Sequence, residues 1–196
     1  MKRTFLTIAL AIITTFSFSA KPHIANVRVN AENSTIKWTG SKVASSHEGT
    51  VNIQKGMLMI DHGTLVGGQF SIDMTSISNT DMEGRKKARL EWHLKNTDFF
   101  DVEQFPLAII TITKAVKGDD NSYKIVADLT IKGITHPVTF PAKVTINGLN
   151  FLATAKIKID RTKWDIKYGS GSFFENLGDK MILDEIEFDI SLESVM

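Results

Sequence analysis

The chain contains no cysteine among its 196 residues. Disulfides, cysteine-ligated zinc, iron–sulfur clusters and thiol catalysis are therefore excluded, and the fold must be stabilised by packing and strand pairing. The chain also lacks an excess of charge of either sign, since 23 basic and 22 acidic residues leave a net charge of +1. Such a balance does not suggest the strongly basic face typical of nucleic-acid-binding proteins. We expect no nucleic-acid partner.

Sequence signatures of catalysis and metal binding are also lacking. The chain has no HExxH and no GxSxG motif, and the glycine-rich stretch at residues 169–179 lacks the Lys-Ser/Thr of a phosphate-binding loop. The histidines have no spacing typical of metal ligands, and we assign two of them, His62 and His136, to exposed turns. We therefore expect no catalytic residue, no metal and no cofactor.

The chain has no hydrophobic run long enough to span a bilayer. Its longest apolar run, residues 5–18, follows Lys2 and Arg3, and the small residues Ser17 and Ser19 lie at the end of this run, as at a signal-peptide cleavage site. This run is shorter than the ~20 residues that a transmembrane helix needs. Residues 1–19 are predicted to be a signal peptide, so we expect a periplasmic or secreted protein with no transmembrane span after its removal.

Most of the remaining chain alternates apolar and polar residues. We interpret residues 20–33 as an N-terminal tail or edge segment, and residues 34–196 as one β domain. Residues 186–192 show the alternation plainly, with acidic residues or serine between apolar ones. Period-two alternation predicts about eight strands, each with one buried and one solvated face, as in antiparallel sheets. Such strands form either a closed barrel or a sandwich, and alternation alone does not separate the two.

Two local signals complete the predicted elements. Asn147-Gly148 between two alternating runs predicts a β-hairpin with a type I′ turn, whose two central residues need positive φ. Residues 79–96 are rich in helix formers and make the one predicted helix, capped by Asn79 or Asp81. Gly84 weakens its first turn, so the helix is expected to begin near Arg85.

Five colinear stretches carry a more specific pattern than alternation. They are "HEGTVNIQKGML" (47–58), "GGQFSIDMTSI" (67–77), "HLKNTDFFDVEQFP" (93–106), "DLTIKGITHPVTF" (128–140) and "IDRTKWDIKYG" (159–169). They resemble sequence blocks of the YceI-like polyisoprenoid-binding proteins, and the clearest, at residues 93–106, looks like that family's HLKSxDFFDVxxYP block. The resemblance covers residues 34–192. One departure is Trp164-Asp165, where the family often has Phe-Gly, and it leaves the local turn geometry open.

The resemblance implies an all-β fold, a lipocalin-like antiparallel barrel of eight strands with the helical segment at residues 79–96 near one opening. It implies a periplasmic or secreted protein that holds a long-chain lipid, typically an isoprenoid, in the barrel. A homodimer is also implied as a possible state.

The candidate ligand-binding residues fall into three groups. Apolar strand residues are expected to line a tunnel, aromatic and leucine side chains after the helix to gate its mouth, and two histidines to meet a polar head group. These are Trp38, Ile53, Phe70, Ile72, Leu129 and Ile131; Leu94, Phe99, Phe100 and Phe105; and His47 and His93. The alternatives are ordinary core packing for the strand residues, an aromatic plug that completes the core, and structural hydrogen bonds for the histidines.

Two other functions fit the residues. A solid-cored stress or interaction module predicts bulky inward residues at every layer and no continuous void. An enzyme acting on lipid or quinone predicts a polar cluster beside the cavity, with His47 or His93 as base. Arg161 is expected to form a salt bridge or, alternatively, to meet an anionic head group. Residues 169–179 are interpreted as a surface loop and another lip of the mouth.

Overall fold

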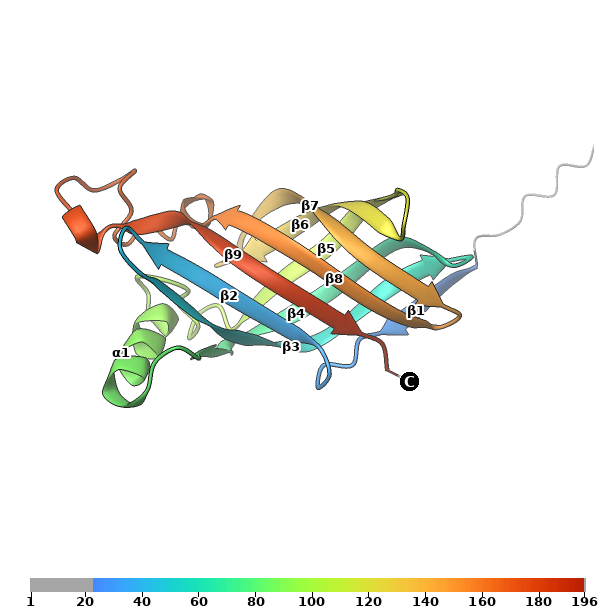
Figure 1. Cartoon of the computed structure of the whole chain (residues 1–196), viewed down its shortest axis with the longest axis horizontal. Helices are drawn as coiled ribbons and strands as arrows, with labels where there is room; N and C mark the ends of the chain where they lie inside the picture. Colours follow the sequence, from blue (N-terminus) through green and yellow to red (C-terminus); the bar gives the residue numbers. More distant parts are fainter. Residues whose placement is uncertain (1–22, 196) are drawn as a thin grey trace, which may run out of the picture.

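The structure is a computed structural model that describes residues 23–195 (Figure 1). The predicted signal peptide at residues 1–19 lies outside the described residues. The elements are β1 (Ile24–Arg28), β2 (Thr35–Lys42), β3 (Ser46–Asp61), β4 (Thr64–Asn79), α1 (Gly84–Lys95), β5 (Leu107–Lys117), β6 (Ser122–Ile131), β7 (Ile134–Asn147), β8 (Asn150–Asp160), β9 (Ile182–Glu193), and the 3-10 turns η1 (Arg161–Trp164) and η2 (Gly178–Lys180).

Eight strands close into a ring. The order β3-β2-β9-β8-β7-β6-β5-β4 is completed by pairing of β3 with β4, and every pairing is antiparallel. The predicted eight-stranded antiparallel barrel is therefore confirmed, and the sandwich is not formed. Closure leaves the ring without free edges on which other chains could pair.

The first strand extends the wall of the ring. β3 is long enough to pair with β2 through its first half and with β1 through its second half, from Met57 to Asp61. Val29, just after β1, forms a bridge with Ser194, just after β9. Residues 24–28 of the segment 20–33 therefore pair with the second half of β3, past the residues of β3 that pair with β2.

Alternation decides which side chains enter the barrel. In β6 the inward residues Tyr123, Ile125, Ala127, Leu129 and Ile131 are all buried, while the residues between them are exposed or half-buried. Burial of such apolar surface supplies about 25 cal/mol per Å² and is the main force that holds the ring together.

The hairpin at Gly148 differs in type from the prediction. Asn147 pairs with Asn150, so the central residues are Gly148 and Leu149. Gly148 has φ +62° and Leu149 is not among the residues with positive φ, which is the pattern of a type II′ turn. The type I′ prediction is wrong here because the turn lies one residue further along the chain.

The helix caps one end of the barrel (Figure 1). α1 spans Gly84–Lys95, and Gly84 itself has φ +56°. The residue before it, Glu83, is the N-cap and makes no side-chain capping bond, so the predicted caps Asn79 and Asp81 are wrong. Both side chains bond instead to β3. Within residues 23–195, no helix has the length and apolar character that crossing a bilayer requires.

Candidate functional site

A cavity of about 220 Å³ lies inside the barrel. All eight strands of the ring, α1 and the turn after α1 contribute to its lining, which is almost wholly apolar. Its polar or charged side chains are Ser41, Lys42, His47, Thr154 and Arg161. The cavity is at odds with the solid-cored alternative, which requires inward side chains that leave no void.

The two ends of the barrel differ. Tyr123 and Phe151, near the starts of β6 and β8, fill the end opposite α1, and the Tyr123 hydroxyl accepts a hydrogen bond from the Leu65 N–H (3.4 Å). At the α1 end the lining includes Lys42 and Leu183, which are exposed. The cavity therefore reaches the surface at the α1 end, which we call the mouth.

The structure places most of the predicted site residues around this cavity. They come from the inward faces of β2, β3, β4 and β6, and from α1 and the turn that follows it. The predicted residues in the lining are Trp38, His47, Ile53, Phe70, Ile72, Leu94, Phe99, Phe100, Leu129 and Ile131.

Two predicted residues, His93 and Phe105, lie outside the lining. His93 precedes Leu94, which faces the cavity from α1. The His93 ring packs edge-on against the rings of Phe99 and Tyr168, with centroid distances of 5.1 Å and 4.4 Å. Phe105 lies beside Gly133 in the turn between β6 and β7. Neither side chain lines the cavity, so their placement does not favour contact with a ligand.

The mouth aromatics combine features of the gate and the plug. Phe99 and Phe100 are both buried, as a plug requires, and both line the cavity, as a gate requires. Their backbone is held locally, because the N–H groups of Phe99 and Phe100 donate to the carbonyls of Asn96 (3.0 Å) and Leu94 (3.1 Å). These side chains narrow the cavity at the α1 end without separating it from the surface.

Small side chains hollow the wall formed by β7 and β8. Ala142 of β7 and Ala155 of β8 are direct cross-strand partners, and both line the cavity together with Ala153 of β8. An alanine ends at Cβ, so a wall of alanines leaves the space that larger inward residues would fill. These alanines were not among the predicted site residues, although their inward positions follow from the alternation.

Arg161 is a fully buried cation at the edge of the cavity. Its guanidinium donates to the carbonyls of Ile166 (2.6 Å), Ile182 (3.0 Å) and Leu183 (3.1 Å), and lies 3.4 Å from an Asp184 carboxylate oxygen. Burial lowers the pKa of Arg161, and the nearby carboxylate of Asp184 opposes this shift. The expected salt bridge is present, but three backbone carbonyls share the guanidinium. Arg161 thereby ties η1 and its loop to the start of β9.

The departure from the family pattern at Trp164-Asp165 has a structural basis. Asp165 has φ +58°, in the left-handed region where glycine is favoured and aspartate is tolerated. Trp164 is buried, and its indole N–H donates to the Leu129 carbonyl (3.1 Å). His136 is not in an exposed turn as predicted: it lies in β7, and its Nε2 is 2.9 Å from the Lys163 carbonyl oxygen.

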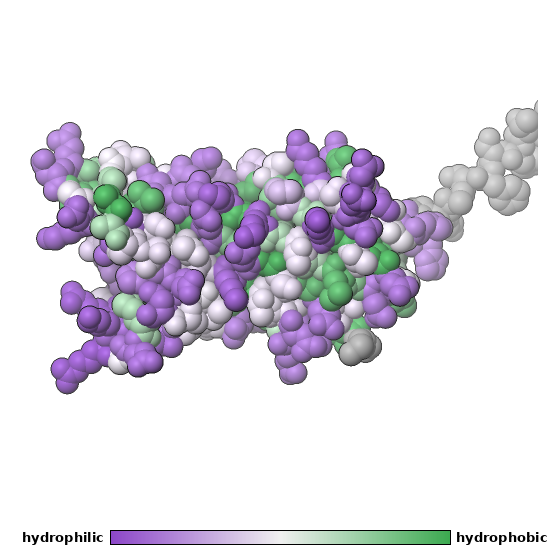
Figure 2. Space-filling model, in the orientation of Figure 1, coloured by the Kyte–Doolittle hydropathy of each residue, from purple (hydrophilic) through white to green (hydrophobic). Residues whose placement is uncertain are grey.

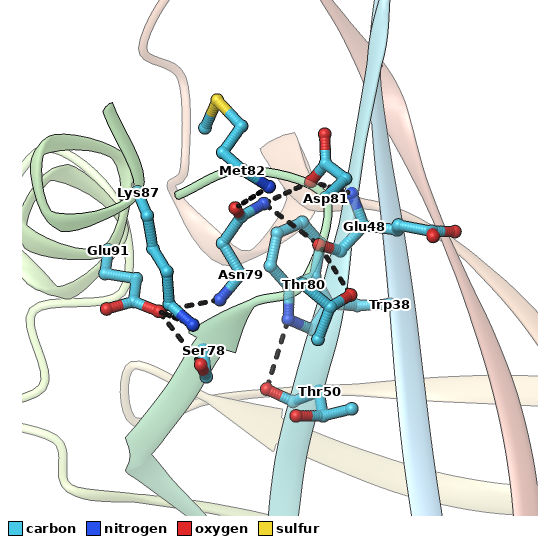
Figure 3. A network of polar contacts seen from close by, with 10 residues as sticks. All are labelled: Trp38, Glu48, Thr50, Ser78, Asn79, Thr80, Asp81, Met82, Lys87 and Glu91. Atoms are coloured by element: carbon cyan, nitrogen blue, oxygen red, sulfur yellow. Dashed lines mark hydrogen bonds and ion pairs between the residues drawn. The ribbon is translucent and has the colours of Figure 1, made fainter. Parts of the chain in front are cut away.

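A polar network fastens α1 to the barrel (Figure 3). The buried Asn79 lies at its centre: its amide donates to the Glu48 carbonyl (3.0 Å) and to Asp81, and its side-chain oxygen accepts from the Met82 N–H (3.0 Å). A carboxylate oxygen of Glu91 accepts from the Asn79 N–H (2.8 Å). The helix is therefore held at the end of β4.

His47 joins the same network from the cavity side. Its Nδ1 lies 2.9 Å from a carboxylate oxygen of Asp81, whose other oxygen accepts from the Glu48 N–H (3.1 Å). Burial raises the pKa of Asp81, but the hydrogen bonds from His47, Glu48 and Asn79 outweigh it and leave that pKa below its ordinary value. Among the described residues, no three His, Asp or Glu side chains gather as metal ligands would.

Comparison with known proteins identifies the family. The sequence profile of the YceI-like domain matches residues 28–194. The chain belongs to the YceI-like family. The resemblance noted from five sequence blocks is thereby confirmed.

Sequence relatives of this YceI-like chain include an UPF0312 protein of Pseudomonas putida, 28% identical over 76% of this chain and 74% of the relative. Protein YceI of Salmonella arizonae is 30% identical over 64% of each chain.

Solved structures with the same fold include BcnA of Burkholderia cenocepacia, with a TM-score of 0.70, 20% identity, and coverage of 85% of this chain and 99% of that chain. A polyisoprenoid binding domain from Saccharophagus degradans has a TM-score of 0.62, 14% identity, and coverage of 89% and 98%. At these identities the likeness shows the shared fold.

Proposed function

We propose that this YceI-like protein holds a long-chain lipid of the isoprenoid type, with the tail in the barrel cavity and the head group at the mouth. The observation that carries the proposal is the apolar cavity that reaches the surface at the α1 end. The name of the Saccharophagus degradans neighbour, a polyisoprenoid binding domain, supports the ligand class. The predicted signal peptide at residues 1–19 supports a periplasmic or secreted carrier or store.

Apolar burial alone supplies enough free energy for such binding. Each buried CH₂ contributes about 0.8 kcal/mol, so ten buried carbons contribute on the order of 8 kcal/mol before costs. Association and ordering of the tail remove several kcal/mol of this. The lining fits such a ligand because it offers dry apolar contacts along the wall and leaves polar groups, such as Lys42 and His47, at the mouth. No catalysis is proposed.

The test begins with the protein purified without detergent from a periplasmic extract. Organic extraction and mass spectrometry are expected to return a long-chain lipid in a fixed ratio to protein, and native mass spectrometry to show its mass on the monomer or a homodimer. Delipidated protein is then offered solanesol, a polyprenol. A protein that is repeatedly empty and also ignores solanesol and fatty acids would contradict the proposal.

A further inference from the structure

The mouth end carries the exposed aromatic side chains of residues 23–195: Trp92, Tyr168, Phe173 and Phe174. Trp92 on α1 is 67% exposed, and Phe173 and Phe174 in the loop before β9 are 50% and 51% exposed. α1 and this loop, residues 165–181, project from the same end of the barrel (Figure 1), and hydrophobic side chains gather over the loop (Figure 2). We call α1 and this loop the two lips of the mouth.

The helical lip is basic. α1 carries five basic residues and one acidic residue, whereas the whole chain has a net charge of only +1. Its one carboxylate, Glu91, faces β4 and pairs with Lys87 (3.7 Å). Arg85 and Arg89 have no carboxylate within ion-pair distance among the described residues, and both are exposed.

The outer face of α1 combines these charges with the tryptophan. Arg85, Arg89 and Trp92 are spaced four and three residues apart, so they share one face of the helix. The opposite face turns inward, where Leu90 and Leu94 line the cavity. One helix therefore touches the cavity with one side and presents two free arginines and a tryptophan to solvent with the other.

The loop lip adds aromatic surface without net positive charge, because residues 165–181 hold Lys167 and Lys180 against Asp165, Glu175 and Asp179. Phe173 and Phe174 are its exposed aromatic pair, and the Lys167 ammonium lies 5.1 Å from the centre of the Phe173 ring. Lys167 is also paired with Asp165 at 2.6 Å. The attraction for an anionic surface therefore comes from α1, while both lips supply side chains that prefer the boundary between water and hydrocarbon.

We propose that the mouth end docks onto an anionic phospholipid bilayer, with Arg85 and Arg89 at the head-group phosphates and with Trp92, Phe173 and Phe174 in the interface. Arginine side chains are attracted to anionic head groups, and tryptophan is enriched at the membrane–water interface. The proposal rests on the proposed lipid-holding function. Docked in this way, the cavity opens onto the bilayer, so a tail passes between membrane and barrel without crossing water.

The two arginines set the expected salt and lipid dependence. A basic residue near an anionic surface contributes about 1 kcal/mol, so removing two charges is expected to weaken vesicle binding on the order of 30-fold. Because the attraction is electrostatic, it is screened over about 8 Å at physiological ionic strength and is expected to weaken further in high salt.

The experiment measures co-sedimentation of the delipidated protein, purified from the periplasmic extract, with vesicles of phosphatidylglycerol and phosphatidylethanolamine, and with phosphatidylcholine vesicles. We expect binding to the anionic vesicles only, and its loss in the R85Q/R89Q and F173S/F174S variants. Tryptophan fluorescence reports whether the mouth end faces the vesicle. Trp38 and Trp164 are only 8% and 1% exposed, so a quencher in the bilayer reaches Trp92 alone. Quenching by brominated lipid is thus expected to report Trp92, and to vanish in W92F.

The matched control is K117Q/K124Q, which removes two exposed charges from the opposite end of the barrel. It is expected to bind vesicles as the wild type does. Equal weakening by this control, binding to both kinds of vesicle alike, or absence of Trp92 quenching would overturn the docking proposal. So would burial of Trp92 in a protein dimer, detected by sedimentation and by quenching with acrylamide.

A second readout separates this proposal from the proposed function. Solanesol delivered from detergent solution is expected to load equally into wild type, R85Q/R89Q and F173S/F174S, since none of the substituted residues lines the cavity. If loading persists and vesicle binding is absent, the docking proposal alone fails. If the wild type does not load, the proposed function fails, whatever the vesicles show.

Discussion

Filling the alanine wall is expected to remove lipid binding without unfolding the barrel. Ala142 and Ala155 face each other across β7 and β8 and line the cavity. The A142L/A155L variant adds three carbons at each position. If these displace about six carbons of the bound tail, at about 0.8 kcal/mol each, the loss approaches 5 kcal/mol, or a factor on the order of 10³ in Kd.

The free energy of unfolding of the A142L/A155L variant is expected to rise while its lipid affinity falls. Substitutions that fill a cavity commonly raise the free energy of unfolding by about 0.5–2 kcal/mol. Added carbons in an already packed core would instead cost about 1–3 kcal/mol. The pair of measurements therefore distinguishes a hollow barrel from a solid one, since only the hollow barrel tolerates both leucines.

The assay compares solanesol binding by fluorescence displacement with urea unfolding of the delipidated protein. Thr145→Leu is the matched control, because Thr145 lies on the same strand, β7, but faces outward and is exposed. The control is expected to bind solanesol as the wild type does. Unchanged solanesol affinity in the double variant would refute the assignment of the cavity as the tail site, and unfolding of that variant would refute the hollow barrel.

Three further predictions concern the mouth. Asn79→Ala leaves buried hydrogen-bonding groups unpaired and is expected to lower the free energy of unfolding by about 1–3 kcal/mol, measured in urea. Hydrogen bonds and, for Glu91, nearby lysines overcome burial and hold the pKa values of Asp81 and Glu91 below their ordinary values. Their stabilisation is thus complete above about pH 4–5 and lost as pH falls through the lowered values, and D81N/E91Q is expected to flatten urea midpoints measured between pH 6 and 3. His47→Ala is expected to retain solanesol binding, and a lipid- or quinone-converting activity abolished by this change would support the enzyme alternative instead.

Alternation was sufficient to identify the inward faces. Seven of the ten predicted site residues that line the cavity lie on strands, where the position of a residue alone fixes the side it faces, as at Phe70 and Ile72. Prediction was weaker outside the strands. The side chains of His93, Phe105 and Asn79 follow the packing of α1 and its flanking turns against distant strands, for which the sequence has no periodic signal.

The sequence by itself determined the strands, their buried faces, the short helix and the family, because each depends on residues near one another along the chain. The tertiary structure alone decided that the barrel is hollow. Inward alanines leave a void only if the register sets them opposite one another, as it does for Ala142 and Ala155, and only if the ring closes around them. Register and closure are properties of strands paired across the whole fold. The same is true of the mouth, where Trp92 and Phe173, far apart in sequence, are brought to one end of the barrel.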